Sequence, residues 1–302
     1  MKKMLFIMNP YAGKRRANRY LTEILEMFNR AGYRVVAHMT AGQGDATEVA
    51  RELGPGMDIV VCCGGDGTFN ETVAGLQMAG ADVPVGYIPA GSTNDFAASL
   101  KIPTEPLEAA QEIVEGKPVY YDAGSFNGRF FSYVASFGAF TRTSYTTPQS
   151  IKNALGHTAY VLSGISELSQ IRNEHVKFEI DGETIEDDFL FGAICNSTSV
   201  GGILTLDPKQ VDMADGKLEV LLVRSPKSLM ELADCIAAVQ SQQYNNCEMI
   251  SFRSGREIKI TADPEMPWTL DGEREDGHRE ITVSNNHLAY RLVQTRDDHD
   301  DA

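Results

Sequence analysis

The sequence predicts an α/β N-terminal domain with an open, mostly parallel sheet, followed by a mainly antiparallel β C-terminal domain. Strand and helix signals alternate over the first third of the chain, which is typical of a parallel sheet with helical connections. Beyond Gly116-Lys117-Pro118, apolar and polar residues alternate with a period of two. The 302 residues suffice for about two domains. We therefore expect an α/β domain over 1–120 and a β-rich domain over 121–302. Whether the last strand returns to the first domain stays open.

The N-terminal strands are predicted from short apolar runs that lie between helical patterns. The run 58–63 is almost continuously apolar, as in strands buried on both faces. Apolar residues at 21, 24, 25 and 28 share one helix face, and Gly32 is placed to end that helix. Asp45 and Glu48 have the spacing of a capping box. Strands are expected at 5–8, 33–39, 58–63 and 83–88, and helices around 21–28, 45–54 and 68–78 and from Asp95 onward.

The C-terminal half is predicted from hairpin turns and alternating strands. Asn127-Gly128 and Asp181-Gly182 each separate two strand-like runs, and such pairs are strong signals of a hairpin. Further strands are expected at 218–223, 257–261 and 280–283, and helices at 159–170 and 229–242. The acidic segment 297–301 is interpreted as a solvated tail.

The composition argues against several classes of protein. The chain has 27 Lys and Arg against 42 Asp and Glu, and a formal net charge of −15 disfavours a nucleic-acid binder and, mildly, tight docking on anionic lipid. No apolar run approaches the roughly 18 residues of a spanning helix. The short apolar stretch after Met1-Lys2-Lys3 is interpreted as a strand rather than a signal peptide. The five cysteines contain no CxxC pair, which is typical of a reduced, cytoplasmic interior.

The strongest functional signal is the segment 64–71, Gly-Gly-Asp-Gly-Thr-Phe-Asn-Glu, which follows a buried strand and opens a helix. Glycines allow a sharp turn and a close approach of a ligand to the backbone. A helix N-terminus offers N–H groups and partial positive charge to an anion. The pattern therefore predicts a phosphate site rather than an ordinary turn. No GxxxxGK[ST] motif occurs and position 70 is Asn, which argues against a P-loop and against a Rossmann fingerprint.

Two further polar turns follow predicted strands. Residues 9–14, Asn-Pro-Tyr-Ala-Gly-Lys, are either a second phosphate contact or a capped turn before an exposed basic stretch. Residues 89–97, Pro-Ala-Gly-Ser-Thr-Asn-Asp-Phe-Ala, either offer hydroxyl and amide donors to a ligand or form an N-cap box. The carboxyl ends of parallel strands meet at one rim, where open α/β sheets bind ligands. We therefore expect the three turns to converge.

Two acidic patterns in the C-terminal half leave alternatives open. Asp271 and Glu273 flank a glycine, either as an acid–base pair for proton transfer or as exposed acids of a hairpin turn, and spacing alone favours the turn. Residues 212–216, Asp-Met-Ala-Asp-Gly, are either a turn or a site for a hard cation. The six histidines show no metal-ligand spacing.

These motifs resemble the diacylglycerol kinase catalytic domain family, which also includes sphingosine and ceramide kinases and bacterial soluble lipid kinases. The resemblance rests on 64–71, 9–14 and 89–97 and continues in order over the chain. The continuing matches are 117–124, Asn127 to Phe131, Asn196-Ser197, Asp215-Gly216 and 270–273. The chain is most similar to the soluble bacterial diacylglycerol kinases, which the stretch 143–148 resembles. Many other bacterial lipid kinases carry an acidic residue where this chain has Gly138-Ala139-Phe140.

The resemblance implies a role for each matching residue. Glu273 would be the general base that deprotonates a lipid hydroxyl, with Asp271 beside it, which reverses the interpretation from spacing alone. The acidic network around a catalytic Mg²⁺ would comprise Asp66, Asp95 and Asp122. The ligands of a second, structural Mg²⁺ would be Asp212, Asp215 and, through its carbonyl, Lys217. The ATP contacts would be Asn9, Pro10, Tyr11, Ala12, Gly13, Thr40, Gly64, Gly65, Gly67, Thr68, Asn70, Glu71 and Thr93.

The activity that the resemblance implies is transfer of the γ-phosphate of ATP, with Mg²⁺, to diacylglycerol or a related lipid, which forms phosphatidic acid or a lipid phosphate. The lipid would enter a cleft between the domains. A cytoplasmic protein in transient, peripheral contact with the inner face of the membrane is therefore expected, with no nucleic-acid partner and with a homodimer as its assembly. The lipid acceptor and the nucleotide preference stay open. The alternatives are a small-molecule kinase of the NAD kinase or phosphofructokinase type, which shares the GGDG signature, and a non-catalytic nucleotide- or lipid-binding regulator.

Overall fold

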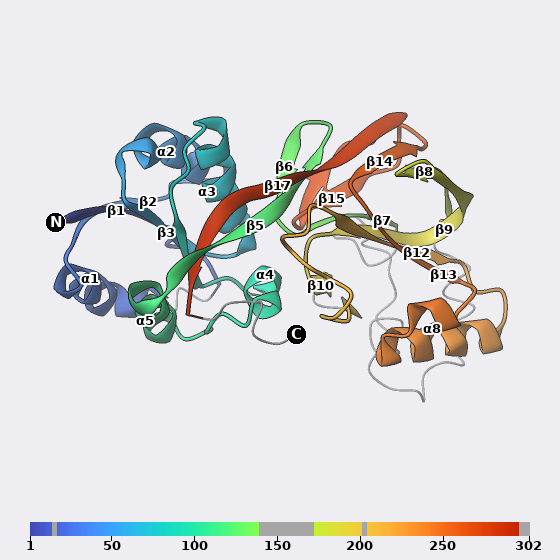
Figure 1. The fold of residues 1–302 in the computed structure, drawn as a ribbon, viewed down its shortest axis with the longest axis horizontal. Helices are drawn as coiled ribbons and strands as arrows, with labels where there is room; N and C mark the ends of the chain where they lie inside the picture. Colours follow the sequence, from blue (N-terminus) through green and yellow to red (C-terminus); the bar gives the residue numbers. More distant parts are fainter. Residues whose placement is uncertain (14–16, 93, 139–171, 201–203, 296–302) are drawn as a thin grey trace. The chain divides into compact units, whose positions relative to one another are not determined.

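The computed structural model describes residues 1–13, 17–92, 94–138, 172–200 and 204–295 (Figure 1). The chain divides into two compact units. Unit 1 comprises Met1–Ala123 and His287–Ala302, and unit 2 comprises Gly124–Asn286. The helix expected at 159–170, the stretch 143–148, Thr93 and the acidic tail lie outside the described residues.

Unit 1 contains a parallel sheet in the order β2-β1-β3-β4, and β17 extends it beyond β4. Leu292 of β17 pairs with Val85 of β4 in the parallel sense. All six residues of β3 are buried, as predicted for a strand that is covered on both faces. The strands β1 (Lys2–Met8), β2 (Tyr33–Met39), β3 (Ile59–Gly64) and β4 (Val85–Pro89) confirm the four predicted strands of this unit. The prediction for the last strand covered only 280–283, whereas β17 (Glu280–Gln294) is longer and its part from His287 onward belongs to unit 1.

Helices cover both faces of this sheet (Figure 1). One face packs against α1 and α5, where Phe6, Phe28 and Ile113 belong to one buried cluster. The other face is covered by α2 and α3, which pack closely on each other. The helices are α1 (Leu21–Arg30), α2 (Asp45–Leu53), α3 (Asp66–Met78), α4 (Asp95–Ser99) and α5 (Pro106–Glu115), with short 3₁₀ turns at Ala17–Tyr20 and Gly54–Gly56.

Three details of unit 1 differ from the sequence-based expectations. Helix α3 begins two residues earlier than expected. The capping box at α2 is wrong, because Gly44 occupies the N-cap in a left-handed conformation and the Asp45 carboxylate accepts the Ala41 N–H at 2.6 Å instead. Helix α5 was not predicted, although Pro106 at its first turn and the apolar spacing that buries Ile113 are both helix signals.

Unit 2 is antiparallel. Its ladder runs β15-β7-β9-β8-β14-β17, with β16 paired to β15 and with β12 bridging β9 and β13. Strand β5 (Lys117–Phe126) begins in unit 1 and ends in unit 2. The other elements of unit 2 are β6 (Arg129–Phe131), β7 (Val134–Gly138), β8 (Glu174–Ile180), β9 (Glu183–Cys195), β10 (Ser199–Val200), β11 (Leu204–Thr205), β12 (Leu218–Arg224), α8 (Leu229–Ser241), a 3₁₀ turn (Tyr244–Asn246), β13 (Ile250–Gly255), β14 (Glu257–Thr261), β15 (Trp268–Leu270) and β16 (Glu273–Glu275). The predicted fold class is therefore confirmed. Among the described residues, no helix is both long and apolar enough to cross a membrane.

Three two-residue hairpins organise unit 2, and each begins with a residue other than glycine at positive φ. Asn127, Asp181 and Asp271 have φ of 47°, 46° and 48°, and each precedes a glycine at positive φ. Positive φ at both central residues is the requirement of a type I′ turn, which matches the twist of the flanking strands. The core between them is aromatic, with Trp268 and Phe137 ring centroids 4.9 Å apart. The Asn-Gly and Asp-Gly hairpin predictions are confirmed.

The close packing of α2 on α3 depends on a glycine. A Cβ atom added to Gly75 would lie 2.3 Å from the Thr47 carbonyl oxygen. We expect Gly75→Ala to destabilise unit 1 by about 1–3 kcal/mol, because overpacking outweighs the gain of roughly 1 kcal/mol in helix propensity. Gly56→Ala, where a Cβ meets nothing within 4 Å, is the matched control. Equal urea-unfolding free energies of the two variants would contradict the packing argument.

Candidate functional site

Three turns of unit 1 meet through their glycines. A Cβ atom added to Gly91 would lie 2.7 Å from the Gly65 Cα, and one added to Gly13 would lie 2.5 Å from the Ala90 carbonyl oxygen. No side chain fits in these gaps. The backbones after β1, β3 and β4 therefore touch, and the predicted convergence of the 9–14, 64–71 and 89–97 turns is observed for their described residues.

The turn after β1 is shaped by Asn9. The Asn9 side-chain oxygen accepts the Tyr11 N–H at 2.9 Å, and its Nδ2 lies 3.4 Å from the Thr68 hydroxyl at the start of α3. The Asn9 N–H donates to the Cys63 carbonyl of β3 at 2.9 Å. Pro10 accepts a hydrogen bond from Asn18, and the Tyr11 side chain is 67% exposed. The amide side chain therefore holds the turn, and Tyr11 is largely exposed beside it.

The turn after β3 leads directly into α3. Gly65 is the N-cap, and a glycine has no side chain with which to cap the first N–H groups of the helix. A Cβ on Gly64 would lie 2.6 Å from the Thr68 side chain, which explains the glycine at the last position of β3. A helix N-terminus that begins at a glycine beside other glycine turns is suited to an anion.

Asp66 caps the neighbouring helix α4. Its carboxylate accepts the Asp95 N–H at 2.9 Å, the Phe96 N–H at 3.3 Å and the Tyr87 hydroxyl at 3.3 Å. Asn94, at φ 55°, makes no side-chain cap and instead binds the Gly91 N–H at 2.8 Å. The alternative of a local N-cap box in the 89–97 turn is therefore wrong for its described residues, because the capping group comes from α3.

The loop after β2 is held by Glu71 of α3. The Glu71 carboxylate accepts the Gly44 N–H at 2.8 Å, and the buried Thr40 donates its N–H to the Met8 carbonyl at 2.8 Å. Asp45 closes the loop: the hydrogen bond from the Ala41 N–H, followed by that from His38, lowers the pKa of its carboxyl. The Asp45–His38 contact was not predicted, since nothing in the sequence marks a strand residue as the partner of a helix start.

Asp122 holds a distortion of β17. Its fully buried carboxylate accepts the Leu288 N–H at 2.7 Å and contacts His287 Nδ1 at 2.9 Å. Leu288 has φ of 52°, a strained conformation for a residue with a branched side chain.

Three more residues were expected to contact the nucleotide. Gly67 and Asn70 lie in the first turns of α3, and Thr93 lies outside the described residues.

In unit 2, Asp271 is a buried anchor. Its carboxylate accepts N–H groups of Ser132, Tyr133 and Val134 at 2.6–3.0 Å and the Ser132 hydroxyl at 2.9 Å. Burial raises the pKa of the Asp271 carboxyl, and these four hydrogen bonds act in the opposite direction. The hairpin interpretation of Asp271-Gly272 is right, but only Glu273, with 31% of its side chain exposed, is accessible.

The segment 212–217 forms local turns. Asp212 accepts the Ala214 N–H at 3.0 Å, and Asp215 accepts the Lys217 N–H at 2.9 Å. The Lys217 carbonyl accepts Asn285 Nδ2 at 2.8 Å. Across the described residues, no group of three His, Cys, Asp or Glu side chains is placed to hold a metal ion. The oxygen donors are nevertheless of the type that Mg²⁺ prefers, and this ion commonly keeps most of its waters.

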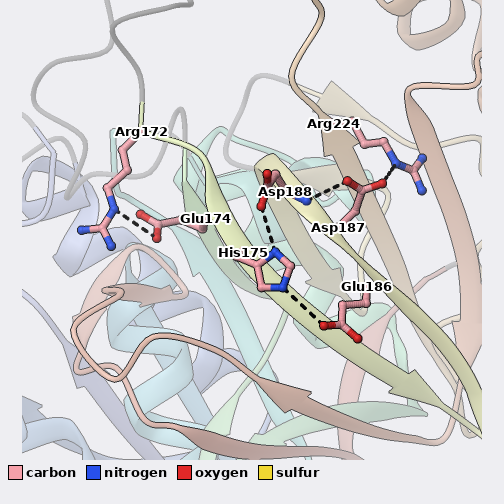
Figure 2. A network of polar contacts seen from close by, with 7 residues as sticks. All are labelled: Arg172, Glu174, His175, Glu186, Asp187, Asp188 and Arg224. Carbon is pink, nitrogen blue, oxygen red and sulfur yellow. Dashed lines mark hydrogen bonds and ion pairs between the residues drawn. The ribbon is translucent and has the colours of Figure 1, made fainter.

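A second charged cluster lies on the β8–β9 hairpin (Figure 2). His175 Nδ1 lies 2.9 Å from Asp188 and its Nε2 lies 3.3 Å from Glu186, and these hydrogen bonds, Asp188 first, raise the pKa of the imidazole. Asp187 pairs with Arg224 of β12. The side chains of His175, Glu186 and Asp188 are largely exposed, so their contacts join β8 and β9 at the surface and add little to stability.

Asp271 gives a stability prediction. We expect Asp271→Asn to lower the free energy of unfolding by about 2–4 kcal/mol, because buried N–H donors lose their acceptor. Asn tolerates the left-handed backbone, so the loss reports the carboxylate. Asp181→Asn is the control, since Asp181 occupies the same turn position at φ 46° and binds the exposed Arg256 and Glu257 N–H groups. Urea unfolding compares them, and equal losses would refute the anchoring role.

Glu219 gives a pH prediction. This residue is 1% exposed, and its Oε2 has no hydrogen-bond partner within the described part of the chain. Burial raises its pKa from 4.5 to about 8. Between these values the unfolded chain is ionised and the folded chain is not, so the stability that this group contributes falls as pH rises from about 4.5 to about 8. In the wild type this decline in the free energy of unfolding is on the order of 3–5 kcal/mol, and Glu219→Gln should remove it. Urea unfolding in EDTA across this pH range tests it, and parallel curves for both proteins would contradict it.

Comparison with known proteins identifies the family. Residues 3–126 match the model of the diacylglycerol kinase catalytic domain, and residues 134–286 match that of the YegS C-terminal NAD kinase beta sandwich-like domain. A diacylglycerol kinase of Bacillus subtilis (strain 168) is 32% identical over 275 residues, which cover 90% of each chain. One of Staphylococcus carnosus (strain TM300) is 32% identical over 273 residues, covering 90% of this chain and 89% of its own. A crystal structure of a diacylglycerol kinase from Bacillus anthracis str. Sterne superposes with a TM-score of 0.77 at 26% identity over 97% of each chain. The chain therefore belongs to the diacylglycerol kinase family of lipid kinases, as its motifs predicted.

Proposed function

We propose that this protein transfers the γ-phosphate of ATP to the hydroxyl of diacylglycerol or a related lipid, giving phosphatidic acid or a lipid phosphate. The observation that carries the proposal is the contact of the Gly13, Gly65 and Gly91 turns beside the start of α3, in a chain of this family. Backbone N–H groups and a helix N-terminus bind phosphates without a basic patch. That mode of binding suits a chain with a net charge of −15.

We propose that Mg²⁺ accompanies the nucleotide. Mg²⁺ is usually held by one or two carboxylates together with substrate phosphates and waters, so a site need not contain a cluster of three acids. Asp66, Asp95 and Asp122 are the proposed acids of unit 1, and Asp212, Asp215 and the Lys217 carbonyl are proposed for a second ion. When bound, the ion neutralises charge on the transferred phosphoryl group.

Glu273 is the proposed general base. It opens β16 directly after a turn that is fixed by the buried Asp271, and its side chain is 31% exposed, so its carboxylate can accept a proton from a hydroxyl group. Asp271, whose oxygens are fully engaged, would position that turn and take no part in proton transfer. Because the acceptor resides in a bilayer, we further propose transient contact with the cytoplasmic membrane surface. A homodimer stays a prediction.

A small-molecule kinase is the second candidate. Unit 2 matches a domain whose description refers to NAD kinase, which is the specific observation in its favour. Side-by-side assays of labelled phosphate transfer to diacylglycerol, a total lipid extract, NAD and fructose 6-phosphate discriminate the two. Labelled lipid alone supports the proposal, and labelled NAD or fructose 6-phosphate alone overturns it.

The base assignment predicts a selective loss of activity. We expect Glu273→Gln to lower kcat by roughly 10²–10⁴-fold, the usual contribution of a general base, with the melting temperature unchanged. Glu280→Gln, an exposed acid of the same unit, is the control and should keep full activity. A folded Glu273→Gln protein that turns over lipid at the wild-type rate would exclude Glu273 as the base.

A further inference from the structure

One guanidinium group contacts both carboxylates of β16. Arg129 Nη2 donates to Glu273 Oε2 at 2.9 Å, and Arg129 Nη1 donates to Glu275 Oε2. Among the described residues, no other group donates a hydrogen bond to Glu273. One oxygen of this carboxylate is therefore held, while its Oε1 receives no hydrogen bond from the described residues.

The local structure explains why Arg129 lies between the two acids. Glu273 and Glu275 are two residues apart on a strand, so their side chains leave the same face and repel each other. The planar guanidinium group has donors on separate nitrogen atoms, so it can bind two carboxylates in a fixed geometry. Glu275 is the more enclosed partner, with 17% of its side chain exposed against 31% for Glu273.

The backbones that carry these side chains each follow a tight hairpin turn. Arg129 opens β6 directly after the Asn127-Gly128 turn. Glu273 opens β16 after the Asp271-Gly272 turn, and the Asp271 carboxylate binds the backbone just beyond β6, from Ser132 onward. Both ends of the Arg129–Glu273 contact therefore start from fixed positions, and the side chains alone decide where the Glu273 carboxylate lies.

We propose that Arg129 is a positioning residue for Glu273, with Glu275 as the anchor that holds Arg129 in place. The inference rests on the proposed role of Glu273 as the base. Arg129 fixes the orientation of the carboxylate by holding its Oε2. Arg129 itself touches neither substrate nor the reacting atoms.

A purely structural role would have a different signature. A half-exposed ion pair contributes about 0–1 kcal/mol to stability, so its loss hardly changes the melting temperature. Misplacing a catalytic group by about 1 Å costs up to roughly 10²-fold in rate. A positioning role therefore lowers kcat far more than it lowers stability.

The test compares three variants, Arg129→Gln, Arg129→Lys and Glu275→Gln, with the control Arg274→Gln. Arg274 lies between Glu273 and Glu275 on β16, and its side chain is 72% exposed. We expect Arg129→Gln to lower kcat about 10–100-fold while KM for ATP stays unchanged. Arg129→Lys should lose less kcat than Arg129→Gln, since it keeps the positive charge but not the two separate donor nitrogens of the guanidinium group. Glu275→Gln should also lower kcat less than Arg129→Gln does. Arg274→Gln should behave as wild type.

Two outcomes would overturn the inference. The first is that folded Arg129→Gln and Arg129→Lys proteins both keep the wild-type kcat. If Arg129→Gln fails to fold, full activity of Glu275→Gln and Arg129→Lys overturns it equally.

Glu273→Gln separates this inference from the proposed function. If Glu273→Gln keeps its turnover, the base assignment fails and the inference fails with it. If Glu273→Gln is inactive and the Arg129 variants match the wild type, the base assignment stands and only the positioning role falls. If no variant, wild type included, phosphorylates lipid, the proposed function is at fault.

Discussion

Unit 1 depends on one steric constraint, the contact between backbone turns that have no room for a side chain. Gly13 and Gly91 each face another turn at a distance that excludes a Cβ atom, and a Cβ on Gly65 would be tight, at 3.2 Å from the Gly91 Cα. This contact gathers the tips of β1, β3 and β4. The N-cap of α3 is one of these glycines, Gly65. The same absence of side chains thus allows the packing and suits the turns to the proposed binding of an anion.

Unit 2 is organised in the opposite way. The turns of unit 1 meet at glycines, whereas unit 2 buries the Asp271 carboxylate among hydrogen-bond donors. Asp271 combines a left-handed backbone with four accepted hydrogen bonds, so the turn before β16 cannot relax without leaving buried N–H groups unpaired. A rigid turn that is followed immediately by an accessible acid is a suitable support for proton transfer.

The strand β3 and the hairpin turns could be predicted from the sequence, because each depends on residues that are close together in the chain. The apolar run 58–63 and the Asn-Gly and Asp-Gly pairs report their structures through periodicity and positive φ, which neighbouring residues alone decide. The carboxylates that bind backbone N–H groups of other elements could not be predicted from the sequence. Asp66 serves α4 across 29 residues and Asp271 serves Ser132 across 139, and the sequence contains no signal of such distant pairing. The Arg129–Glu273 contact was missed for the same reason.

The placement of Asp66 has a consequence for the cooperativity of ligand binding. Helix α4 has only five residues, far too few to be stable alone, and its first N–H groups depend on the Asp66 carboxylate. A cation bound at the Asp66 carboxylate would draw on the same lone pairs and compete with those N–H groups. Its affinity and the local melting of α4 would then be reciprocally linked, and amide hydrogen exchange at Phe96, whose N–H donates to Asp66, would report that link.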